Sequence, residues 1–414
     1  MTARPLLERN QTLGEWLTAQ PVLDENGLKL SAGYTAEVWG NLAGGLDTGA
    51  VYTGLLDFGA ELDLGELAGW KGATVSTTWL WLSGRDASAE LVGNLFTVSN
   101  AAGFDTLRML ELWFEQVLFD DKLSLRFGQL TADSEFFISD YGGLFINGTF
   151  GWPAVAYMNL PEGGPGYPMG TLGARIAVKP VEWFTFQAAV FQGNVFAQDV
   201  NRHGFDWSLD ATTGYTFFNE AQIRWNQSAN DPGLPGYFKA GAWFQTGAYA
   251  DPLADATDAG NSGYYAIIDQ LLYRERVTPG PNAGARNLDA PQDAEAVYQG
   301  LGWFHRIAFA PPGNNFTDFY VDTGLTYKGL LPGRAEDTLG VAFAYAQLSN
   351  GGRSSLSDGG ASAVGAEMGL EFTYQAAITP WFIVQPDLQY IINPGATSDV
   401  GNALVVGCRA KLSF

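Results

Sequence analysis

The stretch that decides the fold is the last one in the sequence, Leu404-Val405-Val406-Gly407-Cys408-Arg409-Ala410-Lys411-Leu412-Ser413-Phe414. Successive side chains of a β-strand point to opposite faces, and here the two faces differ in chemistry. One face carries Leu404, Val406, Cys408, Ala410, Leu412 and Phe414, and the other carries Gly407, Arg409, Lys411 and Ser413, with Val405 as its single aliphatic. A soluble sheet packed on a core could alternate in this way. A last aromatic at the membrane interface instead fits the closing strand of an outer-membrane barrel, which we predict.

The same alternation recurs along the whole chain. In 55–64, 238–246, 368–374 and 384–390, aliphatic and aromatic residues take one face, and charged, amide and glycine residues take most of the other. About ten residues in a tilted strand are enough to cross the apolar band of a membrane. We therefore predict an all-β, transmembrane antiparallel barrel of about sixteen strands, an even number as in single-chain bacterial barrels. The strands are expected near 28–39, 53–64, 72–83, 108–119, 122–131, 171–178, 182–193, 216–227, 236–247, 263–275, 298–310, 315–328, 336–349, 364–378, 381–392 and 402–414.

Composition favours a chain that turns one surface to lipid. The 414 residues include 52 Gly, 13 Trp, 17 Tyr and 27 Phe, whereas only 16% are charged. Soluble proteins usually carry about a quarter charged residues. No apolar run approaches the ~18 residues of a membrane helix. The formal net charge of −22 argues against nucleic acid as a partner. One cysteine and two histidines exclude an internal disulfide and make a zinc site improbable, and we expect neither a cofactor nor a metal.

Connections between the expected strands give a consistency check. Those after even strands should be short periplasmic turns, and those after odd strands long outer loops. Arg276–Val297 departs from this rule, because it is long where a short turn is expected. Leu6–Gly27 does not alternate and is expected to be a short helix or coil, either at the periplasmic mouth or solvated. We therefore assign 1–27 to an N-terminal periplasmic segment and 28–414 to the barrel, and expect a mature chain whose leader has been removed.

A loop folded into the barrel is expected to narrow the channel. A barrel of this size encloses a water-filled lumen, so something must fold inward to constrict it. The stretch Ala132–Gly170 has more aromatics than a loop in open water usually has, and it also carries Asp133, Glu135, Asn147 and Trp152. Packed inside, its aromatics would fix the loop while its carboxylates and amides face the channel. The alternative is an extracellular cap.

Sugar chemistry identifies further candidates on the wall. Aromatic rings stack on the apolar face of a sugar, and planar polar side chains bind pairs of its hydroxyls. The fourth expected strand places Glu111, Trp113 and Glu115 on one face, opposite Leu110, Leu112 and Phe114. Cations that could face these carboxylates are Arg85, Arg108 and, in the sixth strand, Arg175. The competing interpretation is that these charges only hold the inner loop to the wall through salt bridges.

Enzymatic and calcium-binding interpretations are weaker. Glu111 and Glu115 match a glycosidase carboxylate pair only in residue type, and no nucleophile motif or phosphate-binding glycine loop is present, so we predict that the chain is not an enzyme. Asp251, Asp255 and Asp258 lack the regular ligand spacing of a calcium loop.

Several motifs resemble those of the carbohydrate-selective porins of the OprB type. The run Glu111-Leu112-Trp113-Phe114-Glu115-Gln116 is one of them. The others are 34–41, 69–73, 128–137, 139–147, 150–153, 269–274 and 385–390, with the specific part between Gly128 and Pro153. The resemblance implies a sixteen-stranded porin of the Gram-negative outer membrane that admits small carbohydrates such as glucose by passive diffusion. It also implies inward loops after the third and fifth strands, with sugar-contacting roles falling on Arg85, Arg108, Glu111, Glu115 and Trp152, of which the last three lie in matching motifs.

Partners and alternatives follow from this expectation. The expected partners are small carbohydrates, outer-membrane lipid and lipopolysaccharide, the barrel-assembly machinery and, by analogy with other sixteen-stranded porins, two further copies in a homotrimer. One alternative is a general porin, or one selective for organic solutes or ions, without sugar preference. A different class is an outer-membrane or soluble β-rich carbohydrate-binding protein, which the aliphatic outer faces disfavour in its soluble form.

Overall fold

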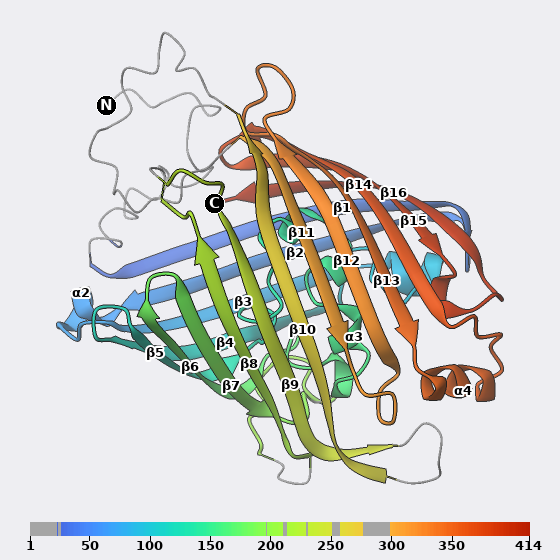
Figure 1. The fold of residues 1–414 in the computed structure, drawn as a ribbon, viewed down its shortest axis with the longest axis horizontal. Helices are drawn as coiled ribbons and strands as arrows, with labels where there is room; N and C mark the ends of the chain where they lie inside the picture. The colour runs from blue at the N-terminus through green and yellow to red at the C-terminus, as the bar shows by residue number, and fades with distance from the viewer. Residues whose placement is uncertain are drawn as a thin grey trace.

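Sixteen strands close into one barrel in the computed structural model of the chain (Figure 1). The structure describes residues 26–195, 197–209, 213–228, 231–250, 257–275 and 299–414, together with Leu23. Each strand pairs antiparallel with its sequence neighbours, and β1 pairs with β16 to close the ring. The strands are β1 (Leu28–Gly45), β2 (Gly49–Asp63), β3 (Ala73–Gly84), β4 (Thr106–Leu118), β5 (Leu123–Leu130), β6 (Thr171–Val181), β7 (Phe184–Gln192), β8 (Tyr215–Trp225), β9 (Gly236–Ala250), β10 (Thr257–Arg274), β11 (Gly300–Phe309), β12 (Thr317–Lys328), β13 (Thr338–Leu348), β14 (Ala366–Thr379), β15 (Phe382–Ile392) and β16 (Gly401–Ser413).

The predicted fold class and all sixteen predicted strands are confirmed. The largest differences are that β1 extends to Gly45 and that β10 begins at Thr257. The described connections between strands contain three short α-helices: α2 (Leu64–Ala68), α3 (Ala154–Tyr157) and α4 (Asn350–Asp358). Within the described residues, none of the helices has the length and apolar content needed to span a bilayer. The expectations for Leu6–Gly27 and Arg276–Val297 fall outside the described residues, apart from Leu23, Asn26 and Gly27.

The two faces of the barrel wall have the expected chemistry. Large apolar side chains such as Val38, Trp81 and Phe127 are more than half exposed on the outer face. The inner face carries polar groups that other protein atoms bury, for example Glu37 and Arg409, which face each other across the β1–β16 seam. This arrangement suits lipid outside and a polar interior.

The two ends of the barrel differ in their connections. The connections after even strands form the turn end and are short where they are described, as in 119–122 and 182–183. The connections after odd strands form the loop end and include the longest described ones, 85–105 and 131–170. The connection 46–48 is an exception at the loop end, since β1 and β2 meet there in a hairpin of three residues.

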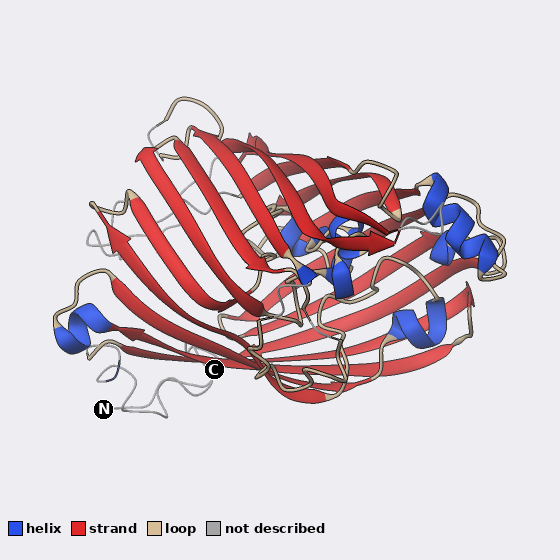
Figure 2. Ribbon diagram, turned by 90° about the horizontal axis from the view of Figure 1, so that it is seen from below, coloured by secondary structure: helices blue, strands red, loops and turns tan. Residues whose placement is uncertain are grey.

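Two loops fold into the lumen, which confirms the inward-folded loops in the predicted fold class. We call residues 85–105 inner loop A and residues 131–170 inner loop B; Figure 2 shows loops and short helices inside the ring of strands. Aromatic and aliphatic side chains of inner loop B form a buried cluster with wall residues of β5 and of β7 to β13. The loops also bind each other, because Gly148 N donates to Thr97 O at 2.7 Å and Asn100 N donates to Ile146 O at 2.8 Å. A second buried cluster joins inner loop A to β1, β2, β15 and β16, so the hydrophobic core of this barrel lies inside its lumen.

A third loop lies against the outside of the wall. Leu110 is an extra residue in β4, because Glu111 pairs with Thr78 and Met109 with Trp79, so the β3–β4 hydrogen bonds are interrupted there. Residues 201–207, which we call the outer strap, cover this bulge. Met109 N donates to His203 O at 3.0 Å, and the Phe205 ring lies 5.6 Å from that of the outward Trp79. The strap thus supplies a hydrogen-bond partner that β3 does not.

Candidate functional site

Inner loop B is held to one side of the barrel by buried charged side chains. The carboxylate of Asp269 on β10 accepts hydrogen bonds from Ser139 Oγ at 2.7 Å and from Asp140 N at 2.6 Å, and it also binds Tyr237. Glu371 on β14 accepts from the backbone nitrogens of Ile146 and Asn147 at 2.6 and 2.9 Å. Carboxylates that accept several N–H groups form strong hydrogen bonds. These contacts fix the path of the loop across the lumen.

A buried arginine adds a third contact on this side. Arg306 on β11 forms an ion pair with Asp322 and is 2% exposed. Its Nη1 donates to Phe137 O at 2.9 Å, and its Nη2 donates to Thr149 O at 2.9 Å. One guanidinium therefore joins the wall to two turns of inner loop B.

The predicted Asn147 belongs to this set of loop contacts. Its Nδ2 donates to Gln389 Oε1 at 3.0 Å, and its Oδ1 accepts from Thr149 N at 3.1 Å. The side chain is buried, so both of its polar atoms serve the loop in this structure.

The other side of the barrel carries a charged cluster on β4, β5 and β6. Arg126 and Arg175 each contact both Glu115 and Glu135, with N–O distances between 2.7 and 3.0 Å. All four side chains are partly or largely buried. We call these four residues the charged cluster. It contains two cations and two anions, and it joins the start of inner loop B to the wall.

Two more predicted residues adjoin the charged cluster. The Arg126 guanidinium lies 4.0 Å from the centroid of the Trp113 ring, a cation–π contact. Glu111 accepts from Thr131 N and Thr131 Oγ1, both at 3.0 Å, where inner loop B leaves β5. The structure therefore brings together five predicted residues: Glu111, Trp113, Glu115 and Arg175 on one inner wall, and Glu135 of inner loop B against them.

A cavity of about 620 Å³ lies between the two inner loops. Predicted residues Asp133 and Trp152 line it, together with aromatic rings and amides of both loops, including Asn100, Phe104, Tyr157 and Tyr167. Trp152 is held by its Nε1, which donates to Gly163 O at 2.8 Å. The Asp133 carboxylate accepts from Tyr167 N at 2.7 Å. Burial raises the pKa of Asp133 to about 6, although the hydrogen bond from Tyr167 acts in the opposite direction.

The remaining predicted residues lie apart from this cavity and from the charged cluster. Arg85 is exposed at the rim of the loop end, where it pairs with Glu90. Arg108 is fully buried: its Nη1 donates to Met169 Sδ at 2.8 Å, and its guanidinium lies 5.3 Å from the Phe104 ring centroid. The bulge at Leu110 shifts the alternation by one residue, which is why Arg108 and Glu111 both face inward.

Arg126 and the cavity aromatics of inner loop A, Phe96 and Phe104, were not among the predicted residues. Arg126 could have been found, because it lies between the outward Leu125 and Phe127 in a short alternating strand. No comparable pattern marks Phe104, because the path of an irregular loop does not produce a periodic alternation of apolar and polar residues. The described residues bring no three His, Cys, Asp or Glu side chains into an arrangement that could hold a metal ion.

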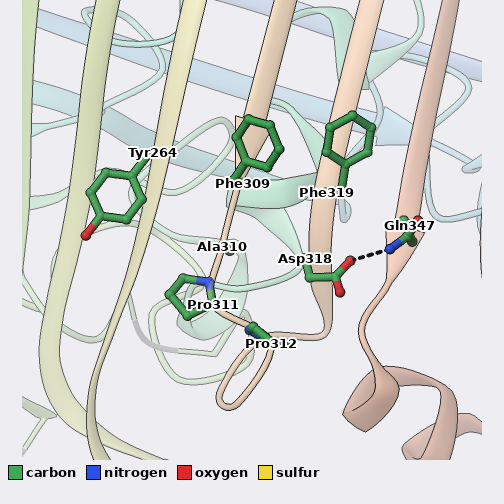
Figure 3. A pocket seen from close by; sticks show the side chains of 8 residues that line it. All are labelled: Tyr264, Phe309, Ala310, Pro311, Pro312, Asp318, Phe319 and Gln347. Carbon is green, nitrogen blue, oxygen red and sulfur yellow. Dashed lines mark hydrogen bonds between the residues drawn. The ribbon is translucent and has the colours of Figure 1, made fainter.

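A separate hollow of about 560 Å³ lies on the outer wall near the loop end (Figure 3). Tyr264, Phe309 and Phe319 project from β10, β11 and β12 around it, and Gln347 donates to Asp318 at 3.1 Å. Tyr264 and Phe309 are about half exposed on the outer face. This hollow belongs to the aromatic band of the membrane interface and not to the channel.

Comparison with known proteins identifies the family of the chain. The family described as "Carbohydrate-selective porin, OprB family" matches residues 47–414. Porin B of Pseudomonas aeruginosa is 25% identical, over 97% of this chain and 91% of its own length. The "Putative porin QuiX" of Acinetobacter baylyi is 22% identical, over 98% and 94%. The high-pH structure of Pseudomonas putida OprB superposes with a TM-score of 0.83 at 24% identity, covering 99% of this chain and all of that one.

These matches agree with the barrel and its inner loops. The barrel and the family are those of a channel, and the family is one of the Gram-negative outer membrane. The chain is therefore a member of the carbohydrate-selective porins of the OprB family.

Proposed function

We propose that a sugar entering this porin makes two successive sets of contacts, first in the cavity between the inner loops and then at the charged cluster. The observation that carries the proposal is the cavity, where Trp152, Tyr157 and Tyr167 lie close to Asp133 and Asn100. Aromatic faces bind the apolar side of a sugar ring, and carboxylates and amides bind its hydroxyls. Both kinds of group are available in one space between loops that narrow the lumen.

The order of the two contact sets follows from strand register. Trp113 pairs with Gly128, and Glu115 pairs with Arg126, further from the loop end. A solute that passes the cavity next meets Glu111 and Trp113 and then the charged cluster. Opposed charges there hold a strong local field, which favours solutes with many hydroxyls over apolar ones. Salt bridges within the cluster also hold inner loop B, so one set of residues serves both purposes.

The proposal is tested by liposome swelling with glucose, a disaccharide and an amino acid of glucose-like size. We expect glucose to enter faster than the amino acid in the wild type. Tyr157→Ala should reduce the glucose-to-amino-acid ratio roughly fivefold, because a stacking surface worth on the order of 1 kcal/mol is removed. Tyr157 is partly exposed, so its truncation is expected to leave the barrel folded.

A matched control is Tyr390→Ala, which removes a partly exposed tyrosine from the outer face of β15 and should leave the ratio unchanged. Equal entry of glucose and the amino acid in the wild type would contradict sugar selectivity at this cavity and favour a general pore.

The proposal also includes the other expected partners, which are lipid, the assembly machinery and further copies of the chain, and the expected N-terminal segment. The apolar outer wall suits contact with lipid and lipopolysaccharide, and a barrel of this kind is expected to require the barrel-assembly machinery. The homotrimer rests on analogy with other sixteen-stranded porins. The separate periplasmic segment 1–27 is supported by the start of β1 at Leu28.

A further inference from the structure

The cavity between the inner loops has an unbalanced charge. Asp86 of inner loop A and Asp133 of inner loop B both line it, and its described lining residues include neither lysine nor arginine. Asp86 accepts from Ser88 N at 2.8 Å and Asp133 accepts from Tyr167 N at 2.7 Å. Both donors are backbone groups, so neither hydrogen bond brings a cation to the carboxylate. Glu115 and Glu135 differ in this respect, because two arginines pair with them.

Neighbouring charges do not cancel this imbalance. Glu111 adds a further negative charge that acts on Asp133. Arg108 lies behind Phe104 and donates to the neutral sulfur of Met169, so its charge offsets one of these three carboxylates and leaves two. Arg409, which donates to the lining residue Asn100, pairs with Glu37, and Arg85 pairs with Glu90 at the rim. Inner loop B has no lysine or arginine anywhere in its sequence, although it contains Asp133, Glu135, Asp140 and Glu162. A partly enclosed space with acidic walls raises the local concentration of cations.

We propose that Asp86 and Asp133 are specificity-determining residues that make this porin favour cationic sugars, namely amino sugars with a protonated amine. Neutral sugars of the same shape are bound less tightly, and sugar acids are disfavoured. This inference rests on the proposed function, since it assumes that sugars occupy the cavity. A sugar ammonium group offers three donors and one positive charge to carboxylate oxygens, while the aromatic rings contact the sugar ring as they would in a neutral sugar.

The test is a single-channel titration in planar bilayers, in which sugar binding is measured as block of the ion current. At pH 7, glucosamine, N-acetylglucosamine and glucose are compared on the wild type and on the double variant Asp86→Asn/Asp133→Asn. We expect glucosamine to bind roughly two- to fivefold more tightly than N-acetylglucosamine in the wild type, as for a partly exposed ion pair. In the double variant that ratio should fall to about one, with the affinity for glucose little changed.

A matched control variant is Asp399→Asn, which removes a carboxylate from the connection between β15 and β16, away from the cavity. It should keep the wild-type preference for glucosamine. Equal binding of the two amino-sugar derivatives by the wild type, or a preference that survives in the double variant, would overturn the inference. If either of these two results is obtained while glucose still blocks the current, the proposed sugar pathway stands and only the charge selectivity fails. If no sugar blocks the current, the proposed function fails as well.

Discussion

At the scale of single residues, the surroundings of Asp133 set the pH at which the cavity loses charge. Because burial raises the pKa of this carboxyl to about 6, it is ionised at pH 7.5 and largely neutral at pH 5. Its charge therefore appears as the pH rises through about 6. We expect the cation preference, measured as the reversal potential in a potassium chloride gradient, to decrease on acidification through that pH. Burial also raises the pKa of Asp86, the other carboxyl of the cavity. Asp133→Asn should therefore remove the step centred near pH 6, and an unchanged step in that variant would assign it to Asp86.

The inward or outward position of a residue could be predicted only where its strand is regular. Alternation alone identified Glu111, Trp113 and Glu115 as inward, because β4 is regular over those positions. It could not determine that Arg108 is also inward, since one inserted residue at Leu110 reverses the pattern and nothing in the local sequence marks a bulge. The pairing of Glu115 with Arg126 depends on strand register, which the sequence predicts only within a few residues.

At the scale of elements, inner loop B is held by buried acceptors more than by its own regular structure. In Glu371→Gln one acceptor oxygen becomes an NH2 donor, so one of the two hydrogen bonds from Ile146 N and Asn147 N should be lost, at a cost of about 1–3 kcal/mol for a buried donor left unsatisfied. We expect faster hydrogen exchange over residues 137–150 and larger current fluctuations, with the barrel intact. Glu66→Gln on the exposed helix α2 is the control and should change neither measurement. Unchanged hydrogen exchange in Glu371→Gln would mean that Asp269 and Arg306, and not Glu371, hold inner loop B in place.

The elements differ in how far sequence could predict them. Strands were found because a wall between lipid and polar interior forces a period of two on the sequence. The inward position of Ala132–Gly170 was inferred from its aromatics, and Phe137 and Phe150 do pack in the lumen. The path of the loop was beyond inference, because it depends on partners such as Asp269 and Arg306 that lie more than a hundred residues away.

At the scale of the whole molecule, the barrel depends on the seam between its first and last strands. The pair Glu37–Arg409 spans that seam, and the Glu37 side chain is fully buried. Glu37→Ala should lower the free energy of unfolding by roughly 3 kcal/mol, because it leaves Arg409, whose side chain is only 14% exposed, without its charge partner. Glu61→Ala, which breaks the exposed pair with Lys29, should cost at most about 1 kcal/mol. Urea unfolding in detergent micelles measures both, and equal costs would contradict a stabilising role for the seam pair.

The outer strap has a consequence for the order in which this barrel can form. The N–H of Met109 donates to the backbone carbonyl of His203, a residue that is synthesised long after β3 and β4. The backbone carbonyls of Met109 and Leu110 accept hydrogen bonds from Nε2 of Gln129, and Oε1 of Gln129 accepts one from Nε1 of Trp207 in the outer strap. A hairpin of β3 and β4 that entered the membrane alone would carry this unsatisfied N–H into lipid, where such groups are costly. We therefore expect β3 and β4 to remain at the bilayer surface until β7 and the outer strap are present. The strands of this part of the wall would then insert together as one preassembled unit.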